Sequence, residues 1–109
     1  MSTTSPALTL SFVAKLVAKP ETSGEVAAFL TDALALANEE TATPVWFAMR
    51  TDETTFWIVD AFASETDRQA HLDGPIAAAL MANADRLLAS PPEIMPAEVL
   101  AAKHVGVGT

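Results

Sequence analysis

The fold of this chain is decided by residues 45–63, which read VWFAMRTDETTFWIVDAFA. Two apolar runs, 45–50 and 55–63, flank a short polar turn, and this pattern predicts a β-hairpin. Pairing Arg50 with Thr55 gives a register in which both faces of the hairpin are bulky and apolar. The pairs of that register are Phe47 with Ile58 and Met49 with Phe56 on one face, and Trp46 with Val59 and Ala48 with Trp57 on the other.

A hairpin that is apolar on both faces must be shielded from water on each face by other parts of the protein. A sheet with one solvated face would alternate apolar with polar residues. Helices of the same chain can cover one face, but a chain of 109 residues has little left to cover the other. A second copy of the sheet is the simplest cover, so the sequence predicts a homodimer formed by sheet-to-sheet packing.

The segments around the hairpin alternate between strand and helix patterns. Residues 8–18 alternate as a strand, and capping-box spacings at Thr22–Glu25 and Ser64–Asp67 open two helices. Asp73-Gly74-Pro75 breaks the second helix. The order β-α-β-β-α-β predicts an α+β, ferredoxin-like fold with an antiparallel sheet and a broken second helix. Its expected parts are a loosely ordered N-terminus at 1–7, one domain at 8–103 with a first helix to about 40 and a last strand at 93–103, and a tail at 104–109.

The composition limits the classes of function. The chain carries 6 Lys and Arg against 14 Asp and Glu, which gives a net charge of −8. Nucleic acids and anionic membranes bind through basic patches, so we expect neither as a partner. The absence of cysteine excludes disulfides and thiolate sites and fits a cytoplasmic location. With two distant histidines we expect no metal site, and from the pattern of residues we expect neither a signal peptide nor a membrane span.

His71 and Asp60 are the first candidates for chemistry. His71 ends the short helix, and an imidazole there can act as an acid, a base or a hydrogen-bond donor. The alternative is that it caps the helix or packs half-buried against the backbone. Asp60 shares a strand face with three apolar side chains, where an unpaired carboxylate is costly. It is therefore either a structural partner in a salt bridge or hydrogen bond, or a pocket carboxylate of raised pKa.

The other candidates are weaker. Trp46 and Trp57 can stack on a flat aromatic substrate or pack in the core or an interface. Asn83 lies near the apolar stripe of the last helix and is placed to offer an amide to a ligand. Arg86 either pairs with a nearby acid or neutralises an oxyanion at a pocket mouth. No chemistry is assigned to the strand-end charges Lys15 and Arg50, the solvated helix end Glu39-Glu40, or His104 in the tail.

Three segments carry a resemblance to a known family: VAKPETSGEVAAFLTDAL (17–34), residues 45–88 and PPEIMPAEVLAAK (91–103). The most specific part is FASETDRQAHL (62–72), with an aromatic strand end, an acidic helix start and a histidine before leucine. On these residues the chain resembles the antibiotic biosynthesis monooxygenase (ABM) superfamily, within the dimeric α/β-barrel group. It is most similar to short stand-alone members that are assigned by similarity as quinol monooxygenases or have no assigned role.

The resemblance implies a reaction. Characterised relatives oxidise phenolic, quinol or polyketide-like substrates with molecular oxygen and without metal, flavin or another cofactor. Such chemistry needs a dry pocket and a base or hydrogen-bond donor. By this resemblance His71 is that group, helped by Asn83, while Trp46 and the strand aromatics Phe47 and Phe62 shape the pocket. Asp60 stays the further catalytic candidate, and Arg86 the candidate at the pocket mouth.

The sequence departs from the family pattern in three ways. Many relatives carry glutamate where this chain has Asp60, several use a tyrosine that this chain lacks entirely, and the loop 39–44 lacks the usual glycine. Relatives with the same fold have different activities. Two alternatives therefore stay open beside a monooxygenase: a non-catalytic small-molecule-binding or stress-associated dimer, and a cofactor-free isomerase or cyclase.

Overall fold

The computed structural model describes residues 7–103, so the tail 104–109 and all but the last residue of the segment 1–7 lie outside the described residues. The chain forms one antiparallel sheet and three α-helices in the order β-α-β-β-α-α-β, which confirms the predicted ferredoxin-like fold with its broken second helix. The elements are β1 (Leu10–Val17), the 3₁₀ turn η1 (Pro20–Thr22), α1 (Ser23–Glu39), β2 (Val45–Arg50), β3 (Thr55–Ala61), α2 (Glu65–Leu72), α3 (Pro75–Leu87) and β4 (Glu93–Glu98).

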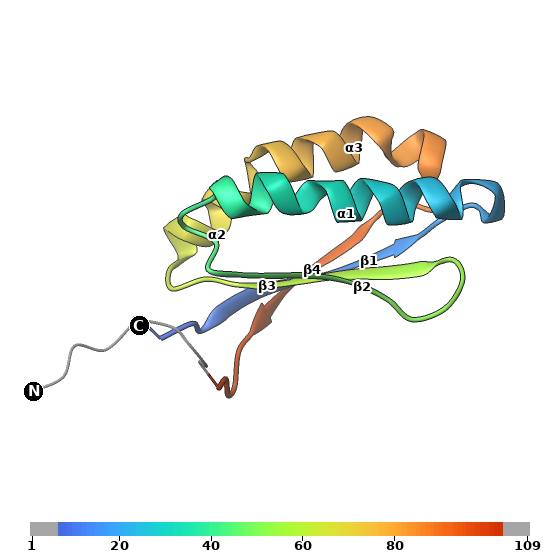
Figure 1. Cartoon of the computed structure of the whole chain (residues 1–109). Coiled ribbons are helices and arrows are strands. Elements are labelled where there is room, and N and C mark those ends of the chain that lie inside the picture. The colour runs from blue at the N-terminus through green and yellow to red at the C-terminus, as the bar shows by residue number, and fades with distance from the viewer. Residues whose placement is uncertain (1–6, 104–109) are drawn as a thin grey trace, which may run out of the picture.

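All three α-helices lie over the same face of the sheet, and no helix or strand within residues 7–103 covers the opposite face (Figure 1). The strands are ordered β2-β3-β1-β4, so β2 and β4 are the edges. The core lies between the sheet and the helices, where Leu16 and Phe56 pack against Val26 and Leu30 of α1 and Leu80 of α3. No helix within residues 7–103 is long and apolar enough to cross a membrane.

The predicted hairpin register is wrong by one residue. Arg50 pairs with Phe56, not with Thr55, because Thr51 and Thr55 already close the turn. Asp52 causes the shorter turn: its Oδ1 accepts hydrogen bonds from the backbone N–H groups of Thr54 and Thr55 at 3.0 and 2.9 Å. An aspartate side chain that replaces a backbone acceptor in this way is a common turn device.

A one-residue shift moves every side chain of β2 to the other face of the sheet. Trp46, Ala48 and Arg50 therefore face the helices, while Phe47 and Met49 lie on the bare face. The bare face is apolar, as the sequence predicted. One apolar row crosses all four strands of this face through the backbone pairs Phe47–Val59, Val59–Val13 and Val13–Met95.

The end of β4 and the start of α1 differ from the prediction. β4 ends at Glu98 instead of near 103, because its partner β1 begins at Leu10, which pairs with Glu98. Thr22 does not cap α1: its hydroxyl donates to the carbonyls of Lys19 and Leu87 at 3.2 and 2.7 Å. At α2, in contrast, Ser64 accepts from the Asp67 amide at 3.1 Å and caps the helix as predicted.

Candidate functional site

His71 lies at the end of α2 with a carboxylate on each ring nitrogen. Its Nδ1 is 2.6 Å from Glu40 Oε1, and its Nε2 is 3.2 Å from Asp60 Oδ2. Glu40 follows α1 directly and Asp60 lies near the end of β3, so the imidazole joins three separate elements. The exposed fractions of the His71 and Asp60 side chains are only 8% and 2%. We call His71, Asp60, Glu40 and Thr43 the histidine cluster.

Both carboxylates of the cluster have further partners. Asp60 Oδ1 accepts a hydrogen bond from the Phe12 backbone N–H at 2.8 Å. Thr43 donates its hydroxyl hydrogen to Glu40 Oε1 at 2.9 Å. Burying a carboxylate without such partners would be costly. Both oxygens of Asp60 and Oε1 of Glu40 have partners, whereas Glu40 Oε2 is buried without one within residues 7–103. The sequence left open which layer Asp60 faces; in the structure it faces the helices, and its partner is His71.

The surroundings of His71 favour the protonated imidazole. Burial lowers the pKa of His71, but the hydrogen bonds and charges of Asp60 and Glu40 outweigh burial and raise the pKa above its ordinary value of 6.5. An imidazolium uses both N–H groups as donors, which matches an acceptor on each side. With both nitrogens occupied in this way, the ring has no free lone pair to act as a general base.

The free space beside His71 is small. A cavity of about 40 Å³ lies between it, Asp60 and the apolar side chains of the core. That volume holds a few water molecules at most and no aromatic ring. The carboxylates bind opposite nitrogens and do not converge on one point, and no group of three His, Asp or Glu side chains within residues 7–103 is placed to hold a metal ion.

The raised pKa of His71 makes stability depend on pH. A group whose pKa is higher in the folded protein stabilises it fully below the unfolded value, about 6.5, and this contribution is lost as the pH rises through the folded value. We therefore expect the free energy of unfolding, measured with urea at one protein concentration, to fall as the pH rises above about 6.5. His71→Gln should remove this fall, and a fall of equal size in that variant would contradict the assignment.

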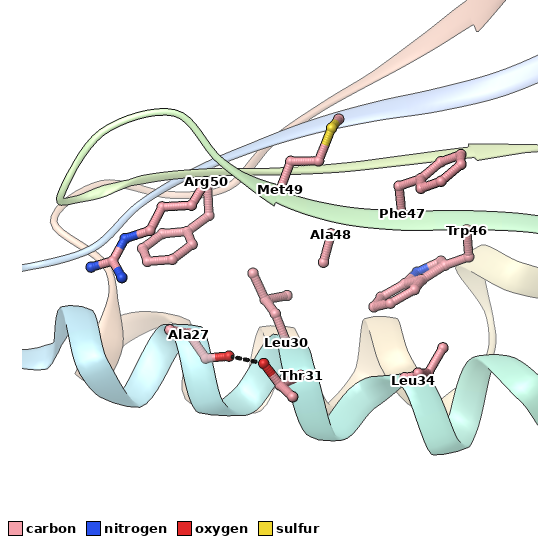
Figure 2. Close-up of a pocket in the computed structure, with 10 residues that line it drawn as sticks. Ala27, Leu30, Thr31, Leu34, Trp46, Phe47, Ala48, Met49 and Arg50 are labelled. Atoms are coloured by element: carbon pink, nitrogen blue, oxygen red, sulfur yellow. Dashed lines mark hydrogen bonds between the residues drawn. The ribbon is translucent and has the colours of Figure 1, made fainter.

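A larger apolar groove lies between α1 and the edge strand β2 (Figure 2). It encloses about 350 Å³, which is within the size range of small-molecule sites. Figure 2 shows Trp46 and Arg50 extending toward α1 at its two ends, with the small Ala48 between them. The groove is lined by Ala27, Leu30, Thr31 and Leu34 of α1, the β2 residues 46–50, and Phe56 of β3.

The groove exists because Ala48 is small. Residues 46, 48 and 50 of β2 point to the same face, and the single methyl group of Ala48 leaves the space between its two large neighbours open. Phe47 and Met49 lie on the opposite side of β2 and reach only the rim (Figure 2). The Trp46 indole N–H is buried and has no acceptor within residues 7–103. Trp46 is also the backbone partner of Asp60, so the groove and the histidine cluster lie next to each other.

The structure divides the predicted site residues into three groups. His71, Asp60 and Phe62 lie together, with the Phe62 ring fully buried 5.4 Å from the imidazole. Trp46 lines the groove, and Phe47 touches only its rim. Asn83 and Arg86 form the third group, which lies on α3 and lines neither the groove nor the small cavity.

Asn83 and Arg86 have partners on the helices. The Asn83 amide donates to the Ala79 carbonyl at 2.8 Å, and its oxygen accepts from Arg86 at 3.2 Å. Arg86 forms an exposed ion pair with Glu25 at 2.6 Å, which matches the interpretation of a charge that pairs with a nearby acid. Neither residue lines the groove or the small cavity.

Glu40 was missed by the sequence analysis. The interpretation of Glu39-Glu40 as a solvated helix end is wrong for Glu40, whose side chain is only 15% exposed and turns to His71. The sequence does not distinguish the two glutamates. Which one turns inward depends on where α1 ends and on the distant position of α2.

Several solved structures are similar to this chain in fold. The NE2512 protein of unknown function from Nitrosomonas europaea is 51% identical over 92% of this chain and 97% of its own, with a TM-score of 0.88. The structure of Rv0793 from Mycobacterium tuberculosis is 14% identical over 88% of this chain and 99% of its own, with a TM-score of 0.78. A "putative antibiotic biosynthesis monooxygenase" from Caulobacter crescentus is 19% identical over 88% and 93%, with a TM-score of 0.74. No protein-family model and no curated protein matches the sequence.

Proposed function

The chain belongs to one family with the NE2512 protein of Nitrosomonas europaea, and from this premise, together with the fold it shares with proteins described as antibiotic biosynthesis monooxygenases, we propose that it is a cofactor-independent monooxygenase of that superfamily. Its substrate in this proposal is a small aromatic, quinol or polyketide-like molecule, which reacts with molecular oxygen. The observation that carries the proposal is the groove of about 350 Å³ between α1 and β2, whose walls are largely apolar.

The reaction balances without a further reductant. A phenol or quinol that gives up its hydroxyl proton to solvent water becomes an electron-rich anion, and this anion can react with oxygen directly. One oxygen atom forms a new bond to the ring carbon, which loses its hydrogen, and the other oxygen leaves as water. The substrate supplies all the electrons and becomes a quinone. The protein has to hold the anion in a site of restricted water.

In this proposal the histidine cluster does not touch the substrate but positions a residue that lines the groove. Trp46 contacts the substrate, and its backbone partner Asp60 is held by His71. His71 and Asp60 are then positioning residues, because the cavity beside them is too small for a ring. Asn83 and Arg86 take no direct part, since their side chains are bonded to each other and to the helices.

Filling the groove should block the reaction. Ala48→Leu adds a branched side chain between Trp46 and Arg50, at an exposed position where the fold itself has room. We expect kcat/KM for oxygen uptake with a hydroquinone substrate to fall by about 10- to 100-fold, because the added carbons take the place of substrate atoms.

Ala28→Leu is the matched control, since it adds the same side chain to an exposed position of α1 that does not line the groove. The control should keep the oxygen uptake of the unchanged protein. Equal activity of Ala48→Leu and Ala28→Leu would show that the reaction occurs elsewhere, and no oxygen uptake with any phenol or quinol would refute the monooxygenase proposal.

A second candidate function is a non-catalytic small-molecule-binding protein. The observation that favours it is the engagement of both His71 nitrogens with carboxylates, which leaves no free imidazole base. This candidate predicts saturable binding in the groove with the ligand recovered unchanged. Mass analysis of the ligand after incubation in air separates it from the monooxygenase.

We also propose that the bare face of the sheet packs on a second copy of the chain. This face exposes Phe47, Met49 and Met95 at 58%, 47% and 43%. Exposed apolar side chains gathered on one face are typical of an interface. A symmetric dimer would bury the same apolar row twice, once in each subunit.

A further inference from the structure

Arg50 is a cation without an acidic partner. Within residues 7–103, Arg68 pairs with Glu65 and Arg86 with Glu25, but no carboxylate lies within ion-pair distance of Arg50. The chain as a whole has 14 acidic residues against 6 basic ones, so acids are in excess. An unpaired guanidinium at the end of an apolar groove is therefore an observation that needs an explanation.

The guanidinium of Arg50 is held in place. Its Nη2 donates to the Ser23 hydroxyl and to the Glu53 carbonyl, both at 2.8 Å. Its central carbon lies 5.0 Å from the centre of the Phe56 ring, in a cation–π arrangement. Nη1 and Nε have no acceptor within residues 7–103. Because the position is already fixed, little conformational entropy remains to be lost when these N–H groups bind an anion.

Neither of the neighbouring acids, Asp52 and Glu53, forms an ion pair with Arg50. Asp52 uses its carboxylate to accept from the amides of Thr54 and Thr55 and so closes the β2–β3 turn. Glu53 contacts Arg50 through its backbone carbonyl. The Asp52 side chain thus shapes the turn that places Arg50, and only the backbone of Glu53 contacts the guanidinium.

The groove adds a flat apolar surface to this cation. Trp46 and Arg50 are four positions apart, which corresponds to about 13 Å along an extended strand. An aromatic ring over Ala48 would lie beside Trp46, Leu30 and Phe56 and have the Arg50 end within reach of a substituent (Figure 2). Guanidinium groups match carboxylates in charge and in the spacing of two hydrogen bonds.

We propose that the groove selects aromatic substrates that carry a carboxylate, with the ring over Ala48 and the carboxylate on Arg50. This inference rests on the proposed function for the site, and it adds the class of substrate. It replaces the earlier interpretation of Arg50 as a strand-end charge with the role of a specificity-determining residue.

The test compares two ligands of the same shape. 2,5-Dihydroxybenzoate and 2,5-dihydroxybenzamide are both quinols, and only the first is an anion at pH 7. Binding is followed without oxygen by calorimetry and by the indole N–H resonance of Trp46, which Trp57→Phe assigns. We expect the acid to bind about 10-fold more tightly than the amide, and the difference to shrink with salt, because charge-assisted bonds to a partly exposed cation are screened.

Variants separate the charge from the fold. Arg50→Gln should bind both ligands equally, and Arg50→Lys should keep part of the preference, because lysine retains the charge without the planar fork. Lys19→Gln removes a positive charge outside the groove and should keep the full preference. Ser23→Ala keeps the charge but loses one bond that positions Arg50, so it should weaken acid binding less than Arg50→Gln.

The outcomes distinguish this inference from the proposed function. Equal affinity for acid and amide in the unchanged protein, or a preference that survives Arg50→Gln, would overturn the inference, even if oxygen is consumed. Preferential binding of the acid through Arg50 supports the inference, even if neither quinol is oxidised; in that case the monooxygenase proposal fails and the binding site stands.

Discussion

Replacing His71 with alanine is expected to lower the free energy of unfolding by about 3–5 kcal/mol, because it leaves two buried carboxylates without their shared cation. Asp60 and Glu40 are held on opposite sides of the ring by bonds of their own, so they cannot simply move to solvent. Small domains are stable by only about 5–15 kcal/mol in total. The measurement is urea unfolding at pH 7, with the protein concentration held constant.

A double variant tests whether the stability lost in His71→Ala comes from the charges of the two buried carboxylates. His71→Ala/Glu40→Gln removes one of the two carboxylates, so it should be more stable than His71→Ala alone by about 1–3 kcal/mol, the coupling expected for side chains in contact. His71→Gln keeps a hydrogen-bond donor but not the charge and should lie between the unchanged protein and His71→Ala. If the double variant is less stable than His71→Ala, the carboxylates do not repel each other and the cluster is not held by charge.

This expected loss affects how activity data on His71 are interpreted. A variant that is largely unfolded consumes no oxygen, whatever the role of the imidazole. The side chain joins α2, β3 and the segment after α1, so its removal loosens three elements at once. Activity measured in His71→Gln at pH 6, at a ligand concentration that keeps the protein folded, is therefore a better test of chemistry than activity in His71→Ala.

Local patterns were enough to predict the fold. The alternation of β1, the paired apolar runs of the hairpin and the break at Gly74-Pro75 each specify an element, and together they give the ferredoxin-like order. The sequence analysis also singled out Asp60 and His71 as the first candidates for chemistry, and the two side chains lie 3.2 Å apart. Contacts of this kind follow from a strand end and the helix that comes directly after it.

The parts of the site that depend on side chains at a distance could not be predicted. The hairpin register depends on the hydrogen bonds of the Asp52 side chain. The predicted register was wrong by one residue, and this placed Trp46 and Phe47 on each other's faces of the sheet. Glu40 differs from Glu39 only in where α1 ends. Arg50 gained its significance only when Ala48 and Trp46 were placed on the same face, because an apolar groove beside a cation is a property of the assembled sheet and helix.

Phe47→Glu is expected to convert the proposed dimer to monomers. Phe47 begins the apolar row that runs through Val59 and Val13 to Met95, and a symmetric interface would place a glutamate there in both subunits. An unpaired buried charge costs about 2–5 kcal/mol or more at an interface, so the dissociation constant should rise by about a thousandfold or more. Sedimentation equilibrium over a range of protein concentrations measures this constant directly.

The design separates the interface from the fold. Phe47 is 58% exposed in the single chain, so the glutamate should leave the fold of the subunit intact, as circular dichroism can verify. Met81 on α3 is also 58% exposed but lies on the helix layer, and Met81→Glu should remain dimeric. If instead Met81→Glu dissociates and Phe47→Glu does not, the subunits meet through their helices. If Phe47→Glu is monomeric and still binds 2,5-dihydroxybenzoate, each groove is complete within one subunit, since Arg50, Ala48 and Trp46 all lie on the other face of the sheet.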